Sequence, residues 1–205
     1  EPDRADSVAG IARRTGTPAM AIILDQLLSN DGHGMLYAPF FNYGYGDLGF
    51  TAAAHQHPHT RMGLSDAGAH CGAICDGGMP TFMLTHWTRD RDRGPRHSLE
   101  YMVHRQTRAT ALTYGLTDRG LIAPGMRADL NLIDLENLAF DMPYMAYDLP
   151  ANGRRLVQKA KGYVATFCNG VQTVDYTEPD EKIPNFGIIA RKKVSAKPNL
   201  PAPVK

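Results

Sequence analysis

The chain has 205 residues, of which 43% are hydrophobic and 21% charged, so it can bury the core of one domain or of two small ones, which excludes a disordered chain. The 22 Lys and Arg side chains almost balance the 21 Asp and Glu side chains, and this balance excludes a polyanion-binding surface, so we expect neither a nucleic-acid nor a membrane partner. Three cysteines favour a reducing compartment, the cytoplasm, over a secreted disulfide framework.

The first half of the chain reads as helices around one βαβ unit. Residues 5–14 and 18–29 carry apolar side chains at helical spacing, and the second set is wide enough to predict a helix buried against a sheet. Residues 35–46 predict a short strand that enters an aromatic loop, residues 47–56 a helix, and residues 61–66 a buried strand ending in Ser65 and Asp66.

The second half changes from helical to strand-and-turn patterns at Gly115. Before that point, helices are predicted over residues 80–87 and 98–114. After it, strands are predicted over residues 130–134, 163–168 and 171–174. The dipeptide Asn169-Gly170 joins the last two strands and indicates a tight hairpin.

All eight histidines precede residue 105, so we expect any chemistry to belong to the first half. The octapeptide Gly63–His70 places Asp66 at the carboxyl end of a predicted buried strand and His70 four residues on. In (β/α) barrels, active sites lie at that end of the strands.

This octapeptide and four later segments resemble the C-terminal part of the amidohydrolase superfamily, in the branch that contains D-aminoacylases and N-acyl-D-amino-acid deacylases. The other segments are residues 85–90, 119–130, 148–155 and 164–171. The resemblance runs from Ser7 to Gly187 and implies an α/β fold, namely the last part of a (β/α)8 barrel with strands of a small β-sandwich. We therefore expect barrel elements over residues 1–115, sandwich strands over 116–190 and a basic, proline-rich tail over 191–205.

The resemblance also implies a metal-dependent hydrolase with one or two zinc ions and a small N-acylated substrate. Asp66 matches the family aspartate that lies beside the metal, takes a proton from metal-activated water and later protonates the leaving amine. The family's other metal ligands, beginning with a His-x-His on the first barrel strand, belong to an N-terminal portion that is not in this sequence.

A complete barrel needs roughly 250 residues, and the first Met is Met20, inside helical sequence. We therefore expect a piece of a longer enzyme that is inactive alone and completed by its N-terminal portion or a partner chain, with a homo-oligomer as another form. Two alternatives stay open: an amidohydrolase that acts on a cyclic amide or carbamoyl substrate, and a non-catalytic fragment or subunit.

Several other residues permit a functional and a structural interpretation. His70 contacts substrate or caps its loop, and Asp76 lines the mouth of a pocket or caps a turn. The run His55-Gln56-His57-Pro58-His59 imitates the family's His-x-His, and His55 and His59 have a zinc-ligand spacing, but the end of a surface helix is favoured for this run. Cys71 and Cys75 are either redox or metal groups or, as we favour, small buried side chains.

Two further groups of residues, one charged and one aromatic, also permit two interpretations. The alternating Arg and Asp residues over 89–96 favour a solvated loop over a site for a substrate carboxylate. The aromatic side chains of the 35–46 segment form an acyl pocket or, more commonly for such sequences, core. These side chains are Tyr37, Phe40, Phe41 and Tyr43. Trp87 is expected to pack between barrel and loop.

Overall fold

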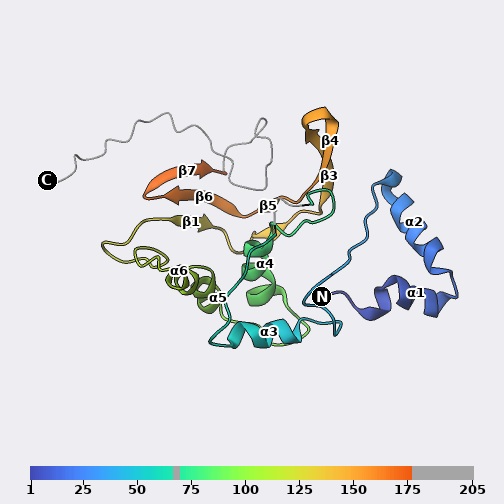
Figure 1. The fold of residues 1–205 in the computed structure, drawn as a ribbon, viewed down its shortest axis with the longest axis horizontal. Coiled ribbons are helices and arrows are strands. Elements are labelled where there is room, and N and C mark those ends of the chain that lie inside the picture. Colours follow the sequence, from blue (N-terminus) through green and yellow to red (C-terminus); the bar gives the residue numbers. More distant parts are fainter. Residues whose placement is uncertain (67–69, 177–205) are drawn as a thin grey trace.

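A computed structural model describes residues 1–66 and 70–176 of the chain (Figure 1). The helical elements are η1 (Arg4–Asp6), α1 (Val8–Thr15), α2 (Ala19–Gly32), α3 (Gly49–Gln56), α4 (Met79–Thr85), the π-helical turn η2 (His86–Asp90), α5 (Leu99–Gln106) and α6 (Arg108–Thr113). The strands are β1 (Leu130–Ile133), β2 (Ala139–Phe140), β3 (Tyr144–Leu149), β4 (Gly153–Val157), β5 (Ala160–Lys161), β6 (Tyr163–Cys168) and β7 (Val171–Asp175), with the 3-10 turn η3 (Pro150–Asn152) between β3 and β4. No helix among these residues is long and apolar enough to cross a bilayer.

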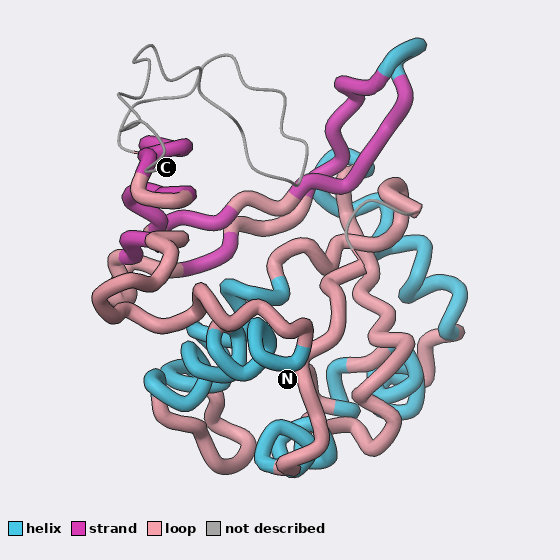
Figure 2. Tube along the Cα trace, turned by 60° about the vertical axis from the view of Figure 1, so that its left-hand side comes forward, coloured by secondary structure: helices cyan, strands magenta, loops and turns pink. Residues whose placement is uncertain are grey.

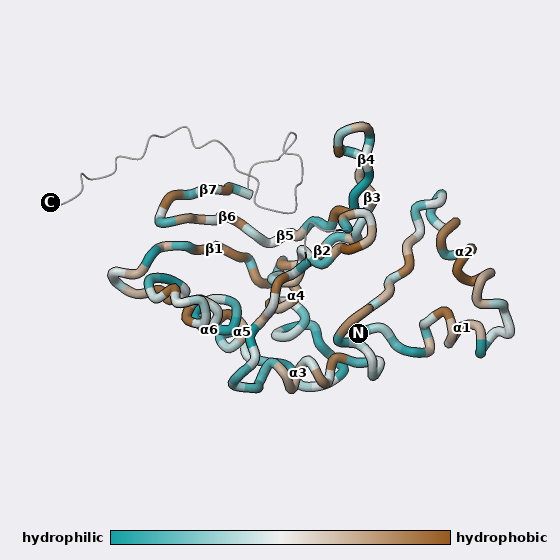
Figure 3. Tube along the Cα trace, in the orientation of Figure 1, coloured by the Kyte–Doolittle hydropathy of each residue, from teal (hydrophilic) through white to brown (hydrophobic). Residues whose placement is uncertain are grey.

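Helices α1 and α2 form where the sequence predicts them, but α2 is not buried. The Ser7 side chain caps α1 by accepting a hydrogen bond from the Gly10 amide, and Gly16 ends it at φ +73°. No residue of α2 is buried, and its leucines face solvent, Leu24 at 55% and Leu28 at 63% exposure. Figure 3 shows the hydrophobic colours along α2, which lies beside α1 and apart from α3 to α6 (Figure 1). The prediction of a helix buried against a sheet is therefore wrong for this structure.

The predicted βαβ unit is also absent. Helix α3 is present, but residues 35–40 and 61–66 are extended without strand pairing, and every strand pair among the described residues is antiparallel. A parallel strand is stable only beside neighbouring strands, because its backbone N–H and C=O groups need partners. The described residues supply no such neighbour to either segment.

A hydrophobic core forms around Trp87 where α3, α4, η2 and α5 meet. Its buried members are Ala52, Met83, Trp87 and Met102. Trp87 is 1% exposed and Met102 is fully buried. The expected role of Trp87 as a packing residue is confirmed, because α3 and α5 both pack against its surroundings. The predicted helix over 98–114 is divided into α5 and α6 at Thr107, whose backbone is not helical (φ −117°, ψ −90°).

The strands of the second half form one three-stranded sheet and two separate pairs. The sheet has the order β1-β6-β7, while β2 pairs with β5 and β3 with β4. The β6–β7 hairpin is confirmed, with Cys168 opposite Val171 and both turn residues, Asn169 (φ 51°) and Gly170 (φ 77°), in the left-handed region that this turn requires. The sequence did not single out β2 to β5 as strands.

The helical and strand parts are joined by specific hydrogen bonds. Thr81 of α4 and Tyr163 of β6 share a hydroxyl–hydroxyl hydrogen bond of 2.7 Å. Arg89 donates to the backbone carbonyls of Leu135 (2.6 Å) and Leu138 (2.9 Å), and Leu138 is fully buried. Figure 2 shows the strands gathered on one side of the molecule and α3 to α6 on the other.

Candidate active site

The segment that carries Asp66 is fixed at its start and free at its end. Arg105, which is 5% exposed, donates to the Thr60 carbonyl (2.8 Å), and Arg61 donates to the Thr113 hydroxyl (2.9 Å). Met62 then packs against the Trp87 core, while Leu64 is 83% exposed. The chain therefore leaves the core at Met62 and presents its next residues to solvent.

Asp66 lies at the exposed end of this segment with an unusual backbone conformation. Its φ is +45°, a left-handed conformation that Asp tolerates better than most residues. Its side chain is exposed and has no hydrogen bond or ion pair to any residue in 1–66 or 70–176. The carboxylate is thus available to a reactant, as proton transfer requires.

His70 and Asp76 lie on the loop that follows, and the structure does not join them to Asp66. His70 is exposed at φ +51°, and its carbonyl accepts hydrogen bonds from the amides of Ala73 and Ile74. Asp76 is exposed, and its carbonyl accepts from the Met79 amide at the start of α4. These contacts are made by backbone carbonyls, and both side chains are open to solvent, so the roles of the two side chains stay predictions.

The loop is anchored to the strand half through Cys71. The Leu156 amide of β4 donates to the Cys71 carbonyl at 2.6 Å. Cys71 and Cys75 are free, but they are half-buried and not fully buried as the favoured interpretation predicts. Burial and the charge of Asp76 raise the pKa of the Cys75 thiol, which argues against a reactive thiolate.

The histidines of the α3 region do not form a zinc site. His55 points into the core, with its ring 4.8 Å from that of Trp87, whereas His57 accepts a hydrogen bond from the His59 amide and both of these lie exposed after the helix. Helix α3 ends at Gln56, so His55 and His59 share no helical face. For His57 and His59 the expected surface helix end is confirmed, but for His55 it is wrong.

The potential metal ligands of the described residues lie apart from one another. Within residues 1–66 and 70–176, no group of three or more His, Cys, Asp or Glu side chains converges to hold an ion. Asp66 is a lone carboxylate there, and zinc sites take three or four protein ligands. The side chains in the described part of the chain therefore do not fit a complete zinc site.

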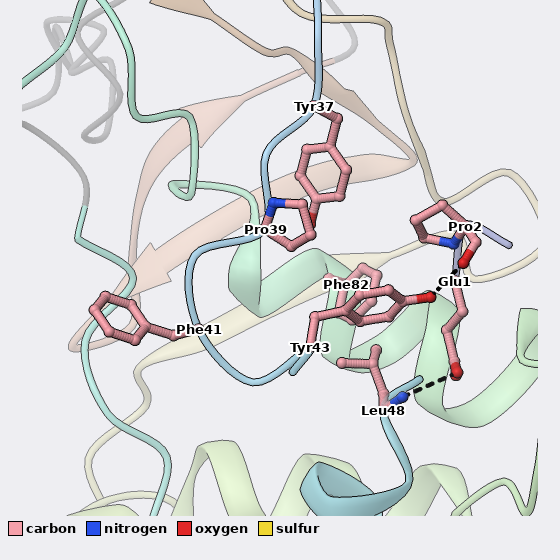
Figure 4. A pocket seen from close by; sticks show the side chains of 8 residues that line it. All are labelled: Glu1, Pro2, Tyr37, Pro39, Phe41, Tyr43, Leu48 and Phe82. Carbon is pink, nitrogen blue, oxygen red and sulfur yellow. Dashed lines mark hydrogen bonds between the residues drawn. The ribbon is translucent and has the colours of Figure 1, made fainter. Parts of the chain in front are cut away.

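An aromatic cavity of about 260 Å³ lies between the start of the chain, the 37–48 segment and α4 (Figure 4). It is lined by Glu1, Pro2, Tyr37, Pro39, Phe41, Tyr43, Leu48 and Phe82. Three of the four aromatic residues proposed for an acyl pocket are in this set. The fourth, Phe40, is absent from the lining, and because Tyr37, Phe40 and Phe41 are all largely exposed, the interpretation of these side chains as core is wrong.

The 89–96 loop differs from the expected solvated face at one position. Arg91 is buried, with 1% of its side chain exposed, and its Nε lies 2.6 Å from the Glu1 carboxylate. Its guanidinium carbon lies 4.9 Å from the centre of the Trp87 ring. Arg93 and Arg96 are exposed, as predicted. Glu1 itself was not anticipated, because one glutamate outside any motif gives no pattern to detect.

Two of the segments that carry the family resemblance have structural roles. Arg155 and Asp148 form a two-pronged ion pair across the β3–β4 hairpin, at 2.7 and 2.6 Å. The Asp129 carboxylate accepts a hydrogen bond from the Asn169 amide at 2.8 Å, which lowers the pKa of Asp129 and ties the start of β1 to the β6–β7 turn. These residues hold the strand half together.

Comparison with known proteins agrees with the resemblance. Residues 48–174 match the amidohydrolase family. The chain is 29% identical over 170 residues to an N-acyl-D-aspartate deacylase from Alcaligenes xylosoxydans xylosoxydans, a match that covers 83% of this chain and 28% of that protein. The chain thus spans under a third of the length of this relative. No solved structure matches it significantly.

Proposed function

Since the chain belongs to the amidohydrolase family, we propose that it is the C-terminal portion of an enzyme that hydrolyses a C–N amide bond. The substrate we propose is an N-acylated D-amino acid, in keeping with the activity for which the deacylase relative is named. The observation that carries the proposal is Asp66, an exposed carboxylate without a described partner at the end of an extended segment inside the matched region.

Asp66 is proposed to transfer the proton. When water attacks the amide carbonyl, the Asp66 carboxylate accepts a proton from that water. The same proton then passes to the leaving nitrogen as the C–N bond breaks, which yields a carboxylic acid and a free amine. Asp66 is exposed at this position, so its carboxylate is open to a reactant.

The metal dependence implied by the family stays a proposal. Because the described residues do not fit a complete zinc site, we propose that the ligands other than Asp66 come from the N-terminal portion of the enzyme or from a partner chain. The 205-residue chain is then inactive alone. A homo-oligomer and a cytoplasmic location also remain predictions.

The aromatic cavity is proposed to receive the apolar acyl group. Its lining is mostly aromatic and aliphatic, and two of its polar groups are paired within the protein: Tyr43 donates to the Pro2 carbonyl at 2.6 Å, and the Glu1 carboxylate is held by Arg91. A mostly apolar wall of this kind suits an apolar group better than a charged one.

Substitution of Asp66 in the complete enzyme tests the proposal. We expect Asp66→Asn to lower kcat/KM for an N-acetyl-D-amino acid by about 10³-fold, because an amide cannot accept the proton. Asp25→Asn, at an exposed position of α2, is the matched control and is expected to keep wild-type activity. Full activity of the Asp66 variant would contradict the assignment.

The two alternatives are separated by substrate and by metal content. Release of the free amino acid from N-acetyl-D-amino acids, without hydrolysis of cyclic imides, supports the deacylase; the reverse pattern supports the cyclic-amide alternative. For the 205-residue chain alone, we expect less than one equivalent of zinc after dialysis. A full equivalent that survives a chelator would show that the chain builds a site by itself.

A further inference from the structure

The first residue of the chain is buried among three segments that are distant in sequence. The Glu1 side chain is 1% exposed. One carboxylate oxygen accepts hydrogen bonds from Arg91 Nε (2.6 Å) and His86 Nε2 (3.2 Å), and the other accepts from the Leu48 amide (3.1 Å). Burial by itself would raise the pKa of Glu1, but these hydrogen bonds and the Arg91 charge lower it, so the carboxylate is ionised at neutral pH.

The loop on the η2 side is shaped around the Arg91 guanidinium. Arg91 donates to the carbonyls of Pro95 (2.7 Å) and Arg93 (3.1 Å) and covers the Trp87 ring. Gly94 permits this close approach, because a Cβ at that position would lie 2.8 Å from the guanidinium and its φ of +134° disfavours other residues. The described contacts of this guanidinium are therefore all with residues of the chain itself, namely Glu1, Arg93, Pro95 and Trp87.

A second arginine extends the contacts to the aromatic loop. Arg93 donates to the carbonyls of Glu1 (3.2 Å), Pro2 (2.9 Å) and Gly46 (3.2 Å) and to the Tyr43 hydroxyl (3.3 Å). The Tyr43 hydroxyl donates in turn to the Pro2 carbonyl, one of the two bonds drawn in Figure 4. Glu1 and Pro2 are therefore held between the 91–97 loop and the 43–48 segment.

These contacts coincide with one wall of the aromatic cavity. Of its lining residues, Glu1, Pro2, Tyr43 and Leu48 all take part in them. We propose that the Glu1 carboxylate is a positioning group which, through Arg91 and the Leu48 amide, fixes the aromatic loop as the wall of the cavity. Its effect on the reaction rests on the proposed function, whereas its effect on the loop does not.

Amide hydrogen exchange in the 205-residue chain tests the effect on the loop. We expect Glu1→Ala to speed exchange of the Leu48 amide by about tenfold, since a hydrogen bond to a charged acceptor is lost. Sodium formate is expected to restore slow exchange by filling the vacated place beside Arg91. Asp6→Ala, which removes an exposed carboxylate nearby, is the matched control and should leave the Leu48 amide unchanged.

Unchanged exchange of Leu48 in Glu1→Ala, or faster exchange that formate does not slow, would overturn the positioning role. If Glu1→Ala fails to fold, Glu1→Gln serves in its place, since it keeps an acceptor for the Leu48 amide and loses the charge that Arg91 faces. For that variant, normal Leu48 exchange is expected together with faster exchange of the 91–97 amides, and normal exchange in both segments would overturn the proposal.

Kinetics of the complete enzyme test the effect on the reaction. Glu1→Ala, which releases the Leu48 amide, is expected to raise KM for an N-butanoyl substrate by about tenfold more than for the N-acetyl substrate, with kcat within about twofold of wild type. Equal effects on both substrates would overturn the link to the cavity. An enzyme with no deacylase activity would instead contradict the proposed function and leave the exchange result standing.

Discussion

Two helical regions of this protein contain similar apolar side chains, which are buried in one region and exposed in the other. Around Trp87, residues from α3, α4, η2 and α5 bury one another, and Met102 has no exposed surface. In α2, Met20 is 72% exposed and Leu28 is 63% exposed.

The difference lies in the partners and not in the helices. Helix α2 is helical from residue 19 to residue 28 and is broken at Ser29, Asn30 and Asp31, whose backbone angles are not helical. An apolar side chain is buried only when other parts of the fold pack against it. The Trp87 core is formed by four elements, whereas α2 packs chiefly against α1. An unpartnered apolar face of this kind is a surface for association.

The largest expected effect lies in the core. Trp87→Ala should lower the free energy of unfolding by about 3–5 kcal/mol, because it leaves a cavity and removes the ring over which Arg91 lies. Trp87→Phe is the control and should cost less. Chemical denaturation measures both, and a loss below about 1 kcal/mol would show that this region is as loosely packed as α2.

Acid should weaken the same core through His55. Burial, followed by the charges of His97 and Arg105, lowers the pKa of His55 from 6.5 to about 4. Between these two pH values the unfolded chain binds a proton that the folded chain does not. Stability is therefore complete above about pH 6.5 and falls as the pH drops toward 4, by about 2–3 kcal/mol.

Denaturation curves at about pH 7 and about pH 4.5 measure this loss. His55→Phe should remove most of the dependence, whereas His33→Phe, at an exposed position, should retain it. The pKa values of His97 and His86 are lowered in the same direction, chiefly by burial, so a smaller slope is expected to persist in the His55 variant. An equal slope in all three proteins would contradict the prediction.

Two glycines provide a matched test of local against global effects. Gly170, in the β6–β7 turn, has φ +77°, and Gly32, at the end of α2, has φ +80°; a Cβ added at either position would meet no atom within 4 Å. Alanine at Gly170 should cost about 1 kcal/mol of global stability. Alanine at Gly32 should introduce the same strain but only fray the end of α2. The midpoint of thermal unfolding should therefore stay at the wild-type value. Equal shifts would mean that α2 unfolds together with the rest.

The smallest expected effect on stability is on the face of α2. Leu24→Ser and Leu28→Ser should change the free energy of unfolding by no more than about 0.5 kcal/mol, because both side chains already face water. They should still reduce self-association in size-exclusion chromatography if that face pairs copies of the chain. A large loss of stability would mean that α2 is buried in solution.

Several features could be predicted from the sequence because they depend on neighbouring residues. The end of α1 just before Gly16 and the Asn169-Gly170 turn depend on a few residues, and both are present, whereas the Ser7 cap was not anticipated, because the first helix was expected to begin at residue 5. The motif around Asp66 indicated the family, which the match over residues 48–174 confirms. The role of Asp66 stays a prediction, as do the domain boundaries, whose last range lies outside the described residues.

Other features could not be read locally. Arg91 belongs to a run of alternating charges that normally lies in solvent, and it is buried because a carboxylate ninety positions away accepts its hydrogen bond. His55 resembled the end of a surface helix, yet α3 turns it toward Trp87. The 35–40 and 61–66 segments have the composition of strands but lack neighbours to pair with among the residues that the structure describes.

The sequence by itself determined the helices, the hairpin, the family and the candidate carboxylate, because propensity, capping and motif identity are properties of short stretches of chain. Only the tertiary structure decided which charges are buried, which apolar faces stay open and where the aromatic cavity forms. Those outcomes depend on contacts between residues far apart in sequence, and local pattern does not encode such contacts.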